Sequence, residues 1–277
     1  MTALELQNRV SAGWMIFRIA LEERLTYRGD FALGTMMRFL PIITHIFLWW
    51  AVYESVNGGR LAGYSFGDMV AYYLLSMLGR AFSSMPGLAS TVAKQIREGE
   101  IKKYLIQPID MLNFMLLGRA AHKVAYYTVA TIPFAIMFFL CRGYFESGIP
   151  NLQVWIAFVL SLFMAFTLGF FLDLCIGLVG FWFLEISSLL FVYMLLNFFL
   201  SGHMFPLDLL PSHWHILISY LPFKYLAYFP AAIYLGKIPQ ESLWQEIGIE
   251  LMWLVGMILL ARVLYQRGLK RYSGYGG

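Results

Sequence analysis

The sequence predicts an all-α polytopic membrane protein with about six transmembrane helices and both ends in the cytoplasm. Of its 277 residues, 60% are hydrophobic and only 13% are charged, whereas a soluble domain carries roughly 45–50% apolar and about 25% charged residues. So little polar surface cannot cover this apolar excess in water, and lipid must act as the solvent. Long apolar segments and a one-sided distribution of Lys and Arg then predict the number and orientation of the helices.

Six apolar segments are expected to cross the bilayer within a single domain, residues 1–277. At 1.5 Å per residue, the apolar run 152–200 is about twice as long as the hydrocarbon core is thick, so it must contain two spans. The turn between them is expected at 177–185, where Gly177, Gly180 and Glu185 interrupt the run. The expected spans are 31–53, 66–89, 124–140, 152–176, 186–201 and 243–265.

Two further segments are apolar but are not expected to span. In residues 5–28, one helical face carries Leu6, Val10, Trp14, Phe17, Leu21 and Leu25, and charges lie opposite. Such a helix lies in the membrane surface or packs on a cytoplasmic partner. Residues 202–239 contain five prolines, which break helices. We expect short re-entrant helices there, on the external side.

The basic residues give the orientation. Residues 1–30, 90–123 and 262–277 hold fourteen Lys and Arg, the opposite side holds four, and Arg38 and Arg80 fall within spans. By the positive-inside rule both termini are cytoplasmic, and we expect a multi-pass protein of the plasma (inner) membrane.

The longest charged cytoplasmic loop, 90–123, contains the segment Lys94-Gln-Ile-Arg-Glu-Gly-Glu-Ile-Lys-Lys-Tyr-Leu-Ile-Gln-Pro-Ile-Asp110. A short helix with Ile101, Tyr104 and Leu105 on one face is expected there, ended by Pro108. From the residues alone, a solvated connector is the favoured interpretation of this segment.

The order of motifs resembles the ABC-2 type transporter permeases, the membrane subunits of type V ABC exporters. Glu98-Gly-Glu100, the basic stretch, Tyr104-Leu105 and Gln107-Pro-Ile109 resemble the cytoplasmic loop between their second and third spans. The amphipathic first helix, the Gly202-His-Met-Phe-Pro206 run and the six-span topology are similar too, so the resemblance covers nearly the whole chain.

This resemblance implies a subunit that works with a separate ATP-binding subunit and with a second permease chain, identical or related. No Gly-x-x-x-x-Gly-Lys-Ser/Thr loop is present, so no cofactor is expected on this chain, and ATP and Mg would bind to the partner ATPase. The loop would dock on that ATPase, and the cargo would be an amphiphile: a lipid, drug, peptide or glycolipid. The expected docking residues are Arg97, Glu98, Gly99, Glu100, Ile101, Tyr104, Leu105 and Pro108.

Several polar residues fall within expected spans. Arg80 either contacts an acidic group of the cargo in a cleft between two permeases or pairs internally, for example with Asp173. Tyr72, Tyr73, Tyr193 and Asn197 either line the same cleft or serve packing.

Other classes of function remain as alternatives. An integral membrane enzyme acting on lipids would use Asp173, Arg80 and the external histidines, and an ion-coupled carrier would need buried ionisable groups or internal repeats. We expect no catalytic set, no metal site at His213 and His215, and no binding of nucleic acid; membrane lipids are the remaining expected partner.

Overall fold

The computed structural model describes residues 3–26, 28–56, 59–107, 109–145, 148, 150–183 and 185–272. The side chains of 3–10, 24, 26, 28–33, 35, 36, 38, 39, 212, 215, 216 and 219 are outside this description. Over the described residues the chain is helical, and the only strand-like pairing is an isolated bridge between Leu61 and Tyr64. This agrees with the predicted all-α class.

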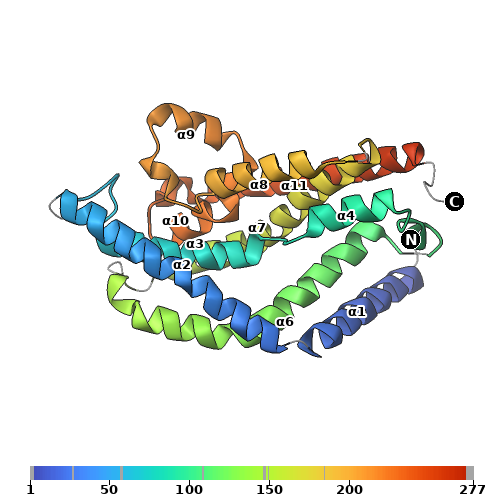
Figure 1. Ribbon diagram of the computed structural model, residues 1–277, viewed down its shortest axis with the longest axis horizontal. Helices are drawn as coiled ribbons and strands as arrows, with labels where there is room; N and C mark the ends of the chain where they lie inside the picture. Colours follow the sequence, from blue (N-terminus) through green and yellow to red (C-terminus); the bar gives the residue numbers. More distant parts are fainter. Residues whose placement is uncertain are drawn as a thin grey trace. The chain divides into compact units, whose positions relative to one another are not determined.

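The elements follow one another along the chain in the order shown in Figure 1. They are α1 (Ala3–Thr26), α2 (Arg28–Ser55), α3 (Phe66–Ser83), α4 (Leu88–Arg97), α5 (Lys102–Leu105), α6 (Met111–Leu140), η1 (Arg142–Tyr144), α7 (Leu152–Leu178), η2 (Val179–Phe181), α8 (Ser187–Leu200), η3 (Leu207–Leu209), α9 (Ser212–Ser219), η4 (Pro222–Leu226), α10 (Tyr228–Tyr234) and α11 (Gln240–Arg271).

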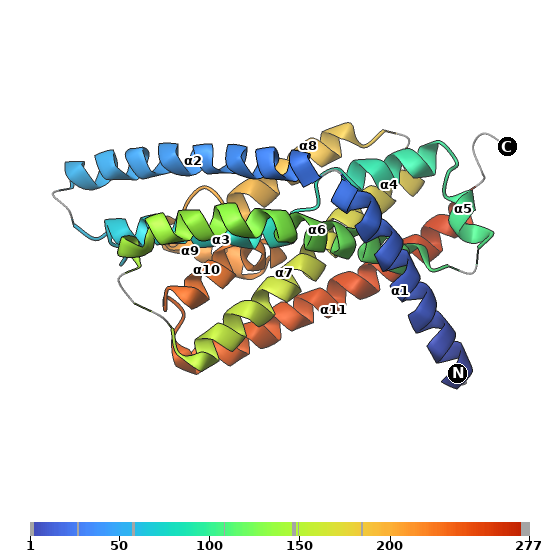
Figure 2. The ribbon, with the colours of Figure 1, turned by 90° about the horizontal axis from the view of Figure 1, so that it is seen from below.

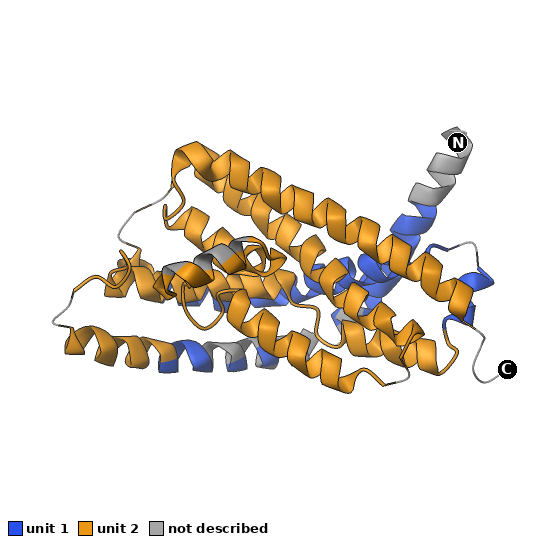
Figure 3. Ribbon diagram, turned by 90° about the horizontal axis from the view of Figure 1, so that it is seen from above, with its two compact units in different colours: residues 1–44, 101–140 blue, residues 45–100, 141–277 orange. Residues whose placement is uncertain are grey.

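The chain forms two compact units, coloured separately in Figure 3. The first contains residues 1–44 and 101–140, that is α1, the first part of α2, α5 and α6. The second contains residues 45–100 and 141–277, which include the remaining helices.

In the first unit, α1 packs along α6. The half-buried stripe of α1 is Gly13, Ile16, Phe17, Ala20 and Leu21, and a Cβ at Gly13 would contact Leu117 of α6. This face is rotated from the expected one, because Trp14 is 65% and Leu25 is 38% exposed. The small residues Gly13 and Ala20 allow the close approach of α6, and the large indole stays outside.

Helix α6 begins well before the span expected at 124–140. Asp110 starts it, since its carboxylate accepts a hydrogen bond from the backbone N–H of Asn113 at 2.8 Å. Residues 111–123, expected as loop, are therefore helical. Arg119 and Lys123 lower the hydropathy of this part without lowering its helix propensity, so an apolar pattern alone places the start too late.

In the second unit, α7 is the central helix, and α3, α4, α10 and α11 all pack on it. Figure 2 shows α7 and α11 running side by side. The apolar run that contains α7 is interrupted after Leu178 by η2, and α8 begins at Ser187. The interruption thus lies in the segment 177–185, where the turn was expected.

Glycines of α7 bring α3 and α4 unusually close. A Cβ at Gly169 would overlap the carbonyl oxygen of Ser83, and one at Gly177 would lie 2.8 Å from that of Ala89. Backbone-to-backbone packing of this kind is available only to glycine. Helix α4 is therefore held against α7 with little space for adjustment.

Among the described helices, three are long and apolar enough to cross a membrane: α6, α7 with η2, and α11. Helix α8 is apolar but has 14 residues, about 21 Å of helix against a hydrocarbon core of about 30 Å. Between α8 and α11 the chain folds into η3, α9, η4 and α10, short helices separated by Pro206, Pro211 and Pro222.

Candidate functional site

The expected docking loop begins where α4 ends, in the second unit. Gly99 has a φ of +77°, a left-handed conformation that ends the helix and that other residues adopt only with strain. Arg97, Glu98 and Glu100 are exposed around this turn, and Glu98 lies 3.9 Å from Lys94. The end of α4 therefore presents charged side chains of both signs.

The rest of the loop belongs to the first unit and differs from the expected single apolar face. Ile101 and Tyr104 are buried, and the Tyr104 ring lies 5.5 Å from that of Phe114. They anchor the loop and offer no docking surface of their own. Leu105 is exposed, and Pro108 lies outside the described residues.

The end of α4 is tied to the turn that follows α7. Arg97 pairs with Glu185 at 3.3 Å, and Glu185 also accepts hydrogen bonds from the hydroxyl and backbone N–H of Ser187. These Ser187 bonds, with a smaller contribution from Arg97, hold the pKa of Glu185 below its usual value. Two segments expected in the cytoplasm are thus connected through ionised side chains.

Tyr72 and Tyr73, expected either at a cleft or in packing, bind the segment that follows α8. The Tyr72 hydroxyl donates to the carbonyl of Gly202, and that of Tyr73 donates to the carbonyl of Met204. Tyr73 also accepts a hydrogen bond from Trp49 at 2.8 Å. Both rings are buried, so the packing role, and not the cleft role, describes them.

Arg80 is the candidate that remains accessible. It is exposed, and its guanidinium carbon lies 5.9 Å from the centre of the Phe198 ring of α8. The imidazole of His203 lies near Arg80. Burial first, and then the charges of Arg80 and His45, lower the pKa of His203 to about 3. This environment favours the neutral form of His203 beside the positively charged Arg80.

Tyr193 and Asn197 lie on one face of α8. Tyr193 donates to Asp173 of α7 at 2.5 Å and accepts a hydrogen bond from Asn197 at 3.4 Å. Asp173, the alternative partner of Arg80, is thus bound by a tyrosine. Among the described residues, no group of three His, Cys, Asp or Glu is placed to hold a metal ion.

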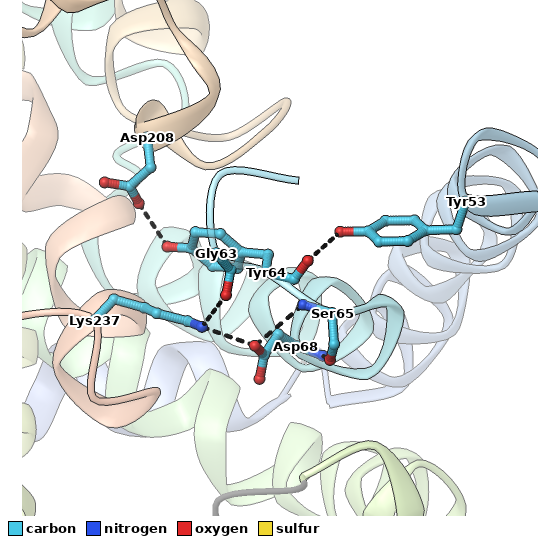
Figure 4. Close-up of polar contacts among 7 residues, drawn as sticks. All are labelled: Tyr53, Gly63, Tyr64, Ser65, Asp68, Asp208 and Lys237. Carbon is cyan, nitrogen blue, oxygen red and sulfur yellow. Dashed lines mark hydrogen bonds and ion pairs between the residues drawn. The ribbon is translucent and has the colours of Figure 1, made fainter. Parts of the chain in front are cut away.

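A polar cluster joins the segment before α3 to the segment between α8 and α11 (Figure 4). Asp208 accepts hydrogen bonds from Tyr64 at 2.6 Å and Tyr228 at 2.8 Å. Lys237 binds Asp68 at 2.7 Å, and Asp68 also closes the capping box that starts α3. Burial, and then the neighbouring Tyr228 and Asp208, raise the pKa of Tyr64, which therefore stays a hydrogen-bond donor.

The fold and these contacts agree with a match to a known family. The sequence model of ABC-2 family transporter proteins matches residues 39–276, nearly the entire chain. The chain belongs to the ABC-2 transporter family. No individually curated protein matches it. This ABC-2 protein is a multi-pass membrane permease subunit of an ABC transporter, a class that generally has no ATPase of its own and partners with an ABC ATPase subunit.

Sequence reasoning did not find two acidic residues of α11. Glu246 accepts hydrogen bonds from Lys224 at 2.9 Å and from Tyr225 at 3.0 Å, and Glu250 is completely buried. The sequence pattern could have revealed both residues, because two carboxylates four residues apart in the expected span 243–265 share one helix face. Acidic residues inside a span are costly and mark functional sites.

Proposed function

We propose that this ABC-2 permease has six spans and cytoplasmic ends, resides in the plasma (inner) membrane, and exports an amphiphilic cargo such as a lipid, drug, peptide or glycolipid. Two permease chains form the pathway, and a separate ATPase, carrying ATP and Mg, drives it. The observation that carries this proposal is the charged end of α4, which protrudes from a helix packed backbone-to-backbone on α7.

Contacts within the second unit support the six-span topology. Segments expected outside touch one another: Tyr64 bonds Asp208, and the Phe145 ring lies 5.9 Å from that of Tyr234. Segments expected inside also touch, since Arg97 pairs with Glu185. An odd number of spans between any two contacting segments would put the contacting residues on opposite sides of the bilayer, so these contacts support the even numbers of spans expected between them.

The loop's geometry supports its role as the coupling element. The exposed Arg97, Glu98 and Glu100 offer charges to a partner, while Gly99 fixes the turn. Because α4 packs closely on α7 at Gly177, a displacement of the loop by the ATPase would act directly on α7. ATP-driven motion would thereby reach the centre of the membrane unit.

The face formed by α3 and α8 supports pairing with a second permease. No residue of α8 is buried within its own chain, and Arg80 is exposed beside it. An arginine at the centre of a span is expensive in lipid hydrocarbon and belongs against protein or water. We therefore place the translocation pathway along this face, with Arg80, Tyr193 and Asn197 near it.

The test is to purify the permease in mild detergent and ask which subunit accompanies it. We expect an ABC ATPase to co-purify, and reconstituted complexes to couple ATP hydrolysis to transport. Glu98→Ala should preserve assembly and ATP hydrolysis but weaken transport. Gly99→Pro should uncouple more severely, because proline cannot adopt a φ of +77°.

A matched control is Glu241→Ala, which removes an exposed carboxylate at the opposite end of the unit, at the start of α11. It should leave transport unchanged. Full transport by both loop variants would contradict the coupling role, and transport without any ATPase subunit would contradict the exporter itself.

A further inference from the structure

Glu250 is the most completely buried charged side chain described in the protein. It has 0% exposure and lies in α11, within the apolar stretch that qualifies as a span. Neither of its carboxyl oxygens has a hydrogen-bond partner among the described residues. Ser161 of α7, also at 0% exposure, lies beside the carboxyl but without the geometry of a hydrogen bond.

This burial is internal to the chain. Glu250 is enclosed where α11 packs on α7, so it would remain enclosed whether lipid or another protein covers the outer surface. An ionised carboxylate in such a place costs several kcal/mol unless a cation or several donors surround it. The described neighbours supply one hydroxyl, so the environment favours the neutral carboxylic acid.

A line of polar groups leads from Glu250 towards the external segment. Tyr225 of η4 donates to Glu246 at 3.0 Å, and its hydroxyl also lies within the electrostatic reach of Glu250. Glu246 is one helical turn before Glu250 and binds Lys224 at 2.9 Å. The Glu246 side chain is 27% exposed, which gives the line an end that water can reach.

A cavity of about 210 Å³ lies at this end of the line. Its walls come from η3, α9, η4, α10 and the start of α11, and include both Lys224 and Glu246. A cavity of this size has room for several water molecules. The Lys224–Glu246 pair can therefore exchange protons with water inside the fold.

We propose that Glu250 is a proton-binding site, filled from the external side through this cavity, Glu246 and Tyr225. The ligand is a single proton from water: the carboxylate gains it on entry and returns it to water on release. The enclosed carboxyl group, without hydrogen-bond partners among the described residues, favours the proton-bound form in this conformation. The site depends on the packing of α7, α11 and η4, and not on the identity of the ATPase or the cargo.

Release of the proton would place a negative charge in an apolar contact. The groups that face it from the elements packed around α11 are Ser161 of α7, Lys224 and Tyr225 of η4, and Glu246 of α11 itself. Lys224 is the only cation in this set. Glu250 and Glu246 would then compete for it, so proton occupancy would set how η4 is held against α11.

The test is infrared spectroscopy of the full-length permease in lipid nanodiscs at neutral pH. We expect a carbonyl stretch of one protonated carboxyl group per chain that disappears in Glu250→Gln. The matched control is Glu241→Gln, which removes an exposed carboxylate at the start of the same helix and should retain the band. Tyr225→Phe should slow the shift of this band after transfer into D₂O.

Ser161→Ala keeps the proposal testable if Glu250→Gln does not fold. Because it removes the hydroxyl that lies beside the carboxyl group, the frequency of the band should change. The proposal is wrong if wild type and Glu250→Gln have the same protonated-carboxyl absorption. It is also wrong if the band appears only after Na⁺ is removed, because the carboxylate would then hold a metal cation. None of these outcomes depends on transport, so they test the proton site independently of the proposed exporter role.

Discussion

The contact between α4 and α7 can be tested at Gly177. A Cβ added there would lie 2.8 Å from the Ala89 carbonyl oxygen and 2.8 Å from the Val92 Cβ. Each distance is 0.6 Å short of the 3.4 Å at which ordinary contact begins. One of the two obstructing atoms belongs to the backbone of α4, so it cannot rotate away, and the helices must separate.

The magnitude follows from two opposed effects. Overpacking costs about 1–3 kcal/mol, and alanine gains about 1 kcal/mol over glycine in a helix. The matched control is Gly256→Ala in α11, where no atom lies within 4 Å of the added Cβ and only the gain applies. We therefore expect Gly177→Ala to be less stable than Gly256→Ala by about 1–3 kcal/mol.

Thermal unfolding in one detergent measures this difference. With about 2–4 °C per kcal/mol for chains of 150–250 residues, the two variants should melt several degrees apart. Gly180→Ala, whose nearest contact is 3.2 Å, should fall between them. The close-packing argument fails if Gly177→Ala melts at or above the temperature of Gly256→Ala.

Three further outcomes are expected at the polar contacts. Tyr64→Phe should lower the free energy of unfolding by about 1–3 kcal/mol, because Asp208 loses one of its two tyrosine donors. An unchanged melting temperature would show that the hydrogen bond from Tyr64 to Asp208 does not stabilise the fold. Breaking a fully buried ion pair costs about 3–5 kcal/mol of stability, and Lys237→Met should cost less because the Lys237 side chain keeps 21% exposure. The loss should still be larger than for Tyr64→Phe, because the carboxylate of Asp68 is left buried without its cation. Because folding lowers the pKa of Glu185, its ionised carboxylate stabilises the fold above about pH 4.5, and this stabilisation is lost as the pH falls through the lower pKa of the folded protein. The melting temperatures of wild type and Glu185→Gln should therefore converge in acid.

The sequence predicted the helical class and the family well, because both depend on patterns spread over the whole chain. A break in the long apolar run was expected at 177–185, since a helix of that length cannot fit one bilayer, and the structure interrupts the run between Leu178 and Ser187. The start of α6 was misplaced because hydropathy reports immersion in lipid, whereas Asp110 and the backbone decide where the helix begins.

The candidate site was predicted less completely, for a physical reason. Tyr72 and Tyr73 have the amphipathic side chains that could line a cleft, but their hydroxyls meet backbone carbonyls of Gly202 and Met204, which no side-chain pattern encodes. Ile101 was assigned to docking through the resemblance to ABC-2 permeases, whereas its side chain is buried within the fold. Contacts between distant segments determined which of these roles each residue has.

The two ends of the second unit are built with different rigidity, and this difference bears on mechanism. At the α4 end, glycines such as Gly177 let the backbones of α4 and α7 pack closely. At the external end, the segment between α8 and α11 is held by hydrogen bonds and ion pairs around Asp208 and Lys237, which can break and re-form singly. If the loop couples to an ATPase as proposed, a displacement that begins there would act on the close α4–α7 contact first. The polar contacts around Asp208 and Lys237 would then be the element that changes arrangement.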